Sequence, residues 1–126
     1  MKYILSFMLI FVISNFDSLK ASENIYIDNI KIAEEYSEEN NTDLLIVFSA
    51  DWCRYCVDLK DAINNDIVNI SKAYTICIVD YDTNRDLVQK YKISKLPESV
   101  ILKDSILIKK KIGFNSYENY RMWLGL

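Results

Sequence analysis

Two cysteines separated by two residues offer the clearest chemistry in this sequence of 126 residues. Cys53 and Cys56 lie in the stretch FSADWCRYCVD, which begins at Phe48. A cysteine pair at this spacing can form a reversible disulfide, can supply half of a metal site, or can be two inert thiols of the core. The residues around the pair decide between these three possibilities.

A metal site is poorly supported by the rest of the chain. Structural zinc needs about four nitrogen or sulfur ligands. The chain has no histidine and only one further cysteine, Cys77, which lies between Ile76 and Ile78 in an apolar run. A buried cysteine in such a run behaves as a small hydrophobic residue. We therefore predict no metal and no other cofactor.

The position of Cys53 favours redox chemistry. The run DLLIVFSA before it is apolar and too short for a helix, as expected of a strand buried on both faces, and residues 53–64 have helical spacing. Free N–H groups and the dipole at a helix N-terminus stabilise a thiolate. Cys53 is the candidate nucleophile, and Cys56, one turn later, is the candidate resolving thiol. Inert core thiols fit less well beside the charged Arg54.

The remaining elements must hold this junction in place. Strands and helices alternate along the chain, which predicts an α/β fold with a central mixed β-sheet and helices on both faces. The last two strands form a hairpin joined by Lys103-Asp104, and Asn115 and Glu118 have capping-box spacing at the start of the final helix. The predicted strands are a short run after Asn24 and residues 43–50, 73–81, 98–103 and 105–113; the predicted helices begin near residues 30, 53, 83 and 115.

The first residues have the layout of a signal peptide. Lys2 supplies an early positive charge, and residues 3–16 are apolar without any charge. A helix of that length reaches only about 21 Å, which is short of the roughly 30 Å hydrocarbon core. We predict a signal peptide over residues 1–21, cleaved near Ala21, and a soluble domain over residues 22–126. An uncleaved membrane anchor is the less favoured alternative.

The charge balance argues against a nucleic-acid partner. The chain has 15 Lys and Arg against 18 Asp and Glu, a net charge of −3. Binding to phosphates needs a basic surface, which this composition does not provide. The successive lysines Lys109, Lys110 and Lys111 fit better as protection of an edge strand against aggregation than as a binding patch.

The strand, the ADWCRYC motif and the following helix resemble the thioredoxin superfamily, over roughly Ile25 to Leu124. Two further residues support the resemblance. Pro97, the only proline, stands directly before a strand, where this family has a cis-proline beside the cysteines, and Gly113 in KIGF is similar to the glycine of the last loop. Within the superfamily the motifs are most similar to the C-terminal domain of the thiol:disulfide interchange protein DsbD. The resemblance implies a substrate groove formed by Trp52, Arg54, Tyr55, Leu96, Pro97 and Gly113.

The sequence departs from the family at one important position. Where the family has a buried aspartate six residues before the first cysteine, this chain has Val47, and the facing lysine is replaced by Ile78. Asp51, Asp58 and Asp61 are possible substitutes or simply solvated acids, and we favour the second interpretation.

Two charged residues have opposite expected effects on the redox centre. Arg54 should favour the thiolate of Cys53, whereas Glu98, directly after Pro97, should oppose it. Tyr55 could stack on a substrate or merely cover the motif. The direction of the redox chemistry is therefore not fixed by these residues.

The resemblance implies an exported thiol–disulfide oxidoreductase that reduces or exchanges disulfides of periplasmic proteins. Its partners would be protein disulfides and a membrane-embedded thiol donor, because the periplasm is kept oxidising. We expect a monomer and favour the reducing direction. The alternative is a non-catalytic binding or chaperone module with a structural disulfide, which the missing acid at Val47 would suit.

Overall fold

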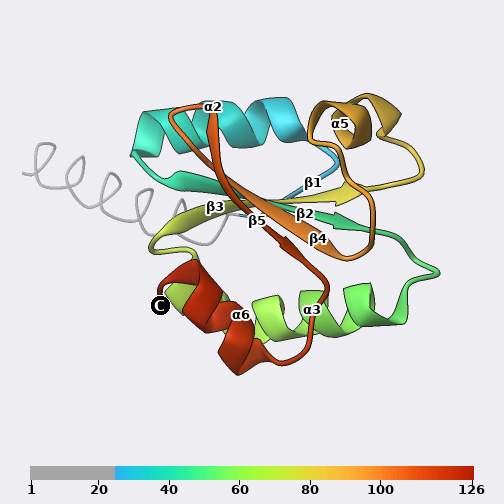
Figure 1. The fold of residues 1–126 in the computed structure, drawn as a ribbon. Helices are drawn as coiled ribbons and strands as arrows, with labels where there is room; N and C mark the ends of the chain where they lie inside the picture. The colour runs from blue at the N-terminus through green and yellow to red at the C-terminus, as the bar shows by residue number, and fades with distance from the viewer. Residues whose placement is uncertain (1–24) are drawn as a thin grey trace, which may run out of the picture.

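A five-stranded mixed sheet forms the centre of the computed structural model, which describes residues 25–126 (Figure 1). The strand order is β1-β3-β2-β4-β5. β1 and β2 pair with β3 in parallel, whereas β4 is antiparallel to both β2 and β5. The strands are β1 (Ile25–Ile27), β2 (Asp43–Ser49), β3 (Tyr74–Asp80), β4 (Glu98–Lys103) and β5 (Ile106–Ile112).

Helices cover both faces of this sheet, with α2 and α5 on one side and α3 and α6 on the other (Figure 1). The central strands must therefore be apolar on both faces, and β2 is buried along nearly its whole length. The helices are α2 (Ile30–Asn40), α3 (Arg54–Asn65), α4 (Ile67–Ile70), α5 (Arg85–Lys90) and α6 (Tyr117–Leu124).

Side-chain alternation along β2 divides the core into two clusters. Ile46 and Phe48 pack towards α2 and α5, whereas Leu45 and Val47 pack against Leu59 and other residues of α3 and α6. Both clusters meet on β2, which pairs with β3 over seven residues and with β4 over five. This strand is thus the most constrained element of the fold, and it ends directly before the cysteine pair.

The α/β fold, the mixed sheet and the order of the main elements confirm the sequence-based prediction. Two local predictions were wrong, and one short helix, α4, was not predicted. The turn of the last hairpin is Asp104–Ser105, where both residues have positive φ, and not Lys103-Asp104. Ser116, not Asn115, caps α6 by accepting the N–H of Asn119. A pair with positive φ suits a tight hairpin because its twist matches that of the strands.

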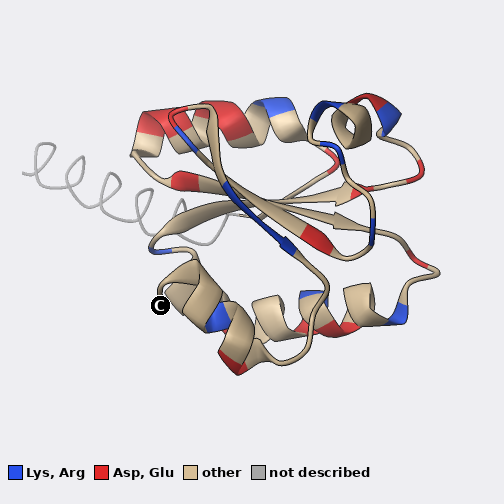
Figure 2. Ribbon diagram, in the orientation of Figure 1, with Lys and Arg blue, Asp and Glu red and all other residues tan. Residues whose placement is uncertain are grey.

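Charged residues are unevenly distributed over the fold (Figure 2). Acidic residues gather on α2, and lysines follow one another along the edge strand β5. Lys109 donates to the carbonyl of Trp123 and lies over its ring, so it joins β5 to α6. Lys110 has a buried partner and is described with the site below. The basic run therefore has structural contacts in addition to protecting the edge.

None of the helices formed by residues 25–126 combines the length and the apolar character needed to cross a membrane. The predicted signal peptide, residues 1–21, lies outside the described residues.

A buried hydroxyl pair gives the first test of the fold. Ser99 Oγ and Tyr120 Oη are 2.7 Å apart, and both residues are shielded from solvent. Tyr120→Phe should lower the free energy of unfolding by about 1–2 kcal/mol, because it leaves a buried hydroxyl without a partner. Urea denaturation measures this loss. The double variant with Ser99→Ala and Tyr120→Phe should lose less stability than the sum of the two single losses. A loss equal to that sum would contradict the coupling between the two hydroxyls.

Candidate active site

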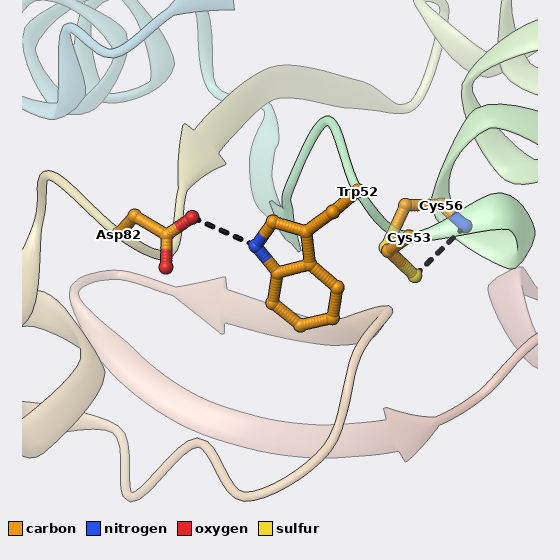
Figure 3. The surroundings of a disulfide bond; sticks show 4 residues. All are labelled: Trp52, Cys53, Cys56 and Asp82. Atoms are coloured by element: carbon orange, nitrogen blue, oxygen red, sulfur yellow. Dashed lines mark hydrogen bonds between the residues drawn. A yellow bond between two sulfur atoms is a disulfide. The ribbon is translucent and has the colours of Figure 1, made fainter.

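The cysteine pair lies where β2 passes into α3 (Figure 3). Cys53 is the N-cap residue of α3: it has an extended backbone, and its Sγ accepts the N–H of Cys56 at 3.3 Å. The N–H of Cys53 in turn donates to the carbonyl of Ala50 at 3.1 Å, which closes the loop that leads into the helix. The sulfur of Cys53 therefore lies in the positive field of the helix N-terminus, as the sequence predicted.

Cys53 and Cys56 form a disulfide, with their Cα atoms 5.2 Å apart. The two cysteines differ in access to solvent: Cys53 is 9% exposed and Cys56 is 0% exposed. An external thiol or disulfide can therefore reach only Cys53 without a rearrangement. This asymmetry fits the predicted roles of Cys53 as nucleophile and Cys56 as resolving thiol.

The segment before β4 closes one side of the cysteine pair. Leu96 packs against the cluster of Ala50, Cys53 and Cys56, and the peptide bond from Leu96 to Pro97 is cis. The carbonyl of Pro97 accepts the N–H of Gly113 at 2.7 Å. Gly113 has a φ of +83°, a conformation that favours glycine. The structure thus brings together five of the predicted residues from three separate parts of the chain.

The other predicted groove residues lie on the surface beside the pair. Trp52 and Tyr55 are 69% and 62% exposed, and Arg54 is exposed between the two cysteines. The indole Nε1 of Trp52 donates to Asp82 Oδ2 at 2.8 Å, which holds the ring beside the loop that follows β3 (Figure 3). Trp52 is therefore fixed in position while its apolar surface remains open to solvent.

Glu98 is fully buried, and its charge is compensated by Lys110 of β5. Glu98 Oε1 accepts the N–H of Ser94 at 3.2 Å, and Oε2 lies 3.2 Å from Lys110 Nζ, without the alignment of a hydrogen bond. Lys110 also donates to the carbonyls of Tyr91 and Lys92, at 2.7 and 3.3 Å. These contacts tie residues 91–94, before the Leu96–Pro97 segment, to β4 and β5. The expected opposition of Glu98 to Arg54 is therefore weakened by a neighbouring cation.

The interior is apolar at the position that the family resemblance singled out. Val47 is fully buried, pairs with Ile78 in the parallel register and contacts the α3 cluster. Asp58 and Asp61 are exposed on α3, in agreement with the solvated interpretation. Residues 25–126 contain no group of three or more histidine, cysteine or acidic side chains that could hold a metal ion.

Cys77 lies apart from this pair. It is fully buried in the cluster on the other face of the sheet, with Ala33 and Val79. Burial raises the pKa of its thiol from the ordinary value of 9.0 to about 12. Cys77 is therefore protonated at neutral pH, as expected of an inert core thiol.

Three polar residues of the site were missed by the sequence analysis. Asp82 holds Trp52, Lys110 holds Glu98, and Ser49, the last residue of β2, has a buried hydroxyl without a hydrogen-bond partner among the described residues. Strand alternation could have placed Ser49 on the α3 face, two residues after Val47. The other two depend on contacts between segments distant in sequence, which spacing cannot predict.

Comparisons with known proteins agree with this geometry. The thioredoxin family model matches residues 26–124. The chain is similar to Thioredoxin 2 of Plasmodium berghei, with 27% identity over 96 residues, which cover 76% of this chain and 57% of that protein. It is 25% identical over 95 residues to the thioredoxin of Buchnera aphidicola, covering 75% of this chain and 87% of that one. The X-ray structure of Fasciola hepatica thioredoxin has the same fold, with a TM-score of 0.69, 22% identity and coverage of 79% of this chain and 96% of that chain.

Alkylation should separate the inert thiol from the reactive one. In the reduced native protein, iodoacetamide at neutral pH should label Cys53 and leave Cys77 unlabelled, because burial keeps the Cys77 thiol protonated. The pKa of the Cys77 thiol is higher in the folded than in the unfolded protein. Its contribution to the free energy of unfolding is therefore fully present below pH 9.0 and is lost as the pH rises towards about 12. Mass spectrometry before and after unfolding checks the labelling, and rapid labelling of native Cys77 would contradict it.

The Glu98–Lys110 pair can be tested by removing one charge. Lys110→Met should lower the free energy of unfolding by about 2 kcal/mol, because a buried carboxylate loses its counter-ion; the lysine side chain is 31% exposed, which limits the effect. Lys111→Met is the control, since it removes the same charge from the next residue of β5 without breaking an ion pair among the described residues. Addition of Glu98→Gln should restore part of the loss. Equal effects of the two lysine variants in urea denaturation would refute this role.

Proposed function

Because the chain belongs to the thioredoxin family, we propose that it is a thiol–disulfide oxidoreductase whose working groups are Cys53 and Cys56. The observation that carries the proposal is the disulfide at the start of α3, in which the N-cap residue Cys53 is partly exposed and Cys56 is fully buried. The matched residues of this chain cover only 57% of the Plasmodium relative. The activity is therefore proposed from the geometry of this chain's own cysteine pair and not from that relative.

The reaction proceeds through a mixed disulfide. The Cys53 thiolate attacks one sulfur of a substrate disulfide; the bond between the substrate sulfurs breaks, and the departing sulfur leaves as a thiolate that takes up a proton. Cys56 then loses its proton and attacks Cys53 Sγ. The Cys53–Cys56 disulfide forms, and the second substrate sulfur is released. The protein is oxidised by two electrons and the substrate disulfide is reduced, so the structure corresponds to the oxidised end state.

The proposed substrates are disulfides of exported proteins. The exposed Trp52 and Tyr55 beside Cys53 offer apolar surface to an extended protein chain, and Leu96, Pro97 and Gly113 close the opposite side. The apolar N-terminal residues support export to the periplasm, and the resemblance of the motifs to the DsbD domain supports the reducing direction. A membrane-embedded thiol donor would then supply the electrons to a monomeric protein.

A binding module with a permanent disulfide is the second candidate. The observation in its favour is Val47, which leaves an apolar contact where the family has an acid near the resolving thiol. Such a module would bind partner chains over the same surface without exchanging electrons.

Insulin reduction distinguishes the two candidates. With dithiothreitol as electron source, the protein should accelerate insulin precipitation at least about tenfold over the background, because Cys53 is accessible at a helix N-terminus. Cys53→Ser should abolish this activity, and Cys56→Ser should trap substrates as mixed disulfides with Cys53. Cys77→Ser is the matched control and should be active. A disulfide that resists millimolar dithiothreitol, with no acceleration, would establish the binding module instead.

A further inference from the structure

The proposed reaction requires a fully buried thiol to lose a proton. Cys56 is 0% exposed, and its contacts include the side chains of Ala50, Cys53 and Leu96. None of these three groups can accept a proton from Cys56 during its attack on Cys53, and Val47 on the adjacent strand is apolar as well. The proton must therefore leave towards another part of the structure.

A polar pocket lies next to Ala50, one of the residues that contact Cys56. It has a volume of about 200 Å³ and is lined, among others, by Ser49, Ala50, Asp51, Lys60, Ile78 and Asp80. Ala50 belongs both to the lining and to the cluster around Cys56, so the pocket and the buried thiol share a wall. A pocket of this size can hold several water molecules, provided that polar groups are there to bind them.

Ser49 supplies a polar group that lacks any other function in the structure. It is only 3% exposed, and its Oγ has no hydrogen-bond partner within the described residues. Alternation along β2 places it on the same sheet face as Val47, under α3. A buried hydroxyl without a partner is unfavourable, and a water molecule in the pocket would supply the missing hydrogen bond.

Lys60 supplies the charge. It follows Cys56 by four residues in α3, so the two side chains share one face of the helix. Lys60 is half-buried, lines the pocket and forms no ion pair among residues 25–126. A cation one helical turn away favours a thiolate over a thiol.

The other charged groups around Cys56 are less suited to this role. Arg54, Asp58 and Lys95 are exposed, and Glu98 is paired with Lys110. Asp28 Oδ1 accepts the N–H of Asp80 and the side-chain amide of Asn84, and Asp80 Oδ1 accepts the N–H of Asp82. Asp51 and Asp80 both line the pocket, where their carboxylates can take a proton from its water.

We propose that this pocket is the route by which Cys56 loses and regains its proton, with Lys60 stabilising the thiolate and the Ser49 hydroxyl binding the pocket water that carries the proton. As the Cys56 thiolate attacks Cys53 Sγ, the bond between Cys53 and the substrate breaks. The proton of Cys56 passes to the pocket and then to solvent or to the carboxylates of Asp51 and Asp80. The inference rests on the proposed function, and it assigns Lys60 and Ser49 as residues that act on the resolving step.

The titration of Cys56 tests the role of Lys60. In a Cys53→Ser background, the ¹³Cβ chemical shift of Cys56 is followed between about pH 6 and pH 11. Lys60→Met should raise the titration midpoint by about 0.5–1 pH unit, and Lys60→Arg should leave it within about 0.3 unit. Lys72→Met removes an exposed lysine before β3 and should have no effect. An unchanged midpoint in Lys60→Met would overturn the proposal.

The resolving step can be timed with a small disulfide, without a protein substrate. Dithiobis(nitrobenzoate) releases one nitrothiophenolate when Cys53 attacks it and a second when Cys56 displaces the first adduct. Ser49→Ala and Lys60→Met should leave the first phase unchanged and slow the second by about threefold or more at neutral pH. If the second phase of Ser49→Ala is as fast as that of the unsubstituted protein, Ser49 takes no part in the proton transfer. Neither readout involves insulin. Failure of the insulin assay would therefore refute the proposed function, whereas an unchanged Cys56 titration and an unchanged second phase would refute the proton route alone.

Discussion

The placement of Cys53 at the first turn of α3 is the constraint on which the site depends. A disulfide forms only between cysteines whose Cα atoms lie close together, and the turn that starts α3 brings those of Cys53 and Cys56 to 5.2 Å. In the same turn the N–H of Cys56 donates to the sulfur of Cys53. This start is fixed because β2, directly before it, is paired on both sides and buried on both faces. At the other end, Leu59 and Ile63 anchor α3 in the core. The reactive residues therefore lie in the first turn of a helix that is held at one end by β2 and at the other by the core.

The sheet also separates the charges around the redox centre. Neighbouring residues of a strand point to opposite faces, so Glu98 lies on the α5 side with Lys110, whereas Ser99 lies on the α6 side with Tyr120. Glu98 directly follows the Leu96–Pro97 segment that closes one side of the cysteine pair, but Lys110 and the N–H of Ser94 compensate its charge. The electrostatic balance at Cys53 then depends mainly on the helix N-terminus and on the exposed Arg54.

Much of this arrangement could be predicted because it depends on local patterns. Continuous apolar runs identified β2 and β3, and the position of Cys53 after a buried strand indicated the helix start. Short elements and caps were predicted less well: α4 has only four residues, and Ser116 competes with its neighbour Asn115 for the same cap. Partners such as Asp82 for Trp52 come from segments thirty residues away, and nothing in the spacing of either residue specifies the pairing.

The exposed aromatic residues leave an open apolar surface beside the disulfide. A disulfide that only stabilises the fold needs no open surface beside it, and covering its sulfurs would protect it. Here Cys53 keeps a small accessible area, and Trp52 and Tyr55 lie near it with most of their surface in water. Holding Trp52 in that position takes a hydrogen bond from its indole to Asp82, so its exposure is built into the structure. Exposed apolar side chains of this kind mark a surface on which a partner can bind, and here that surface borders the more exposed of the two cysteines.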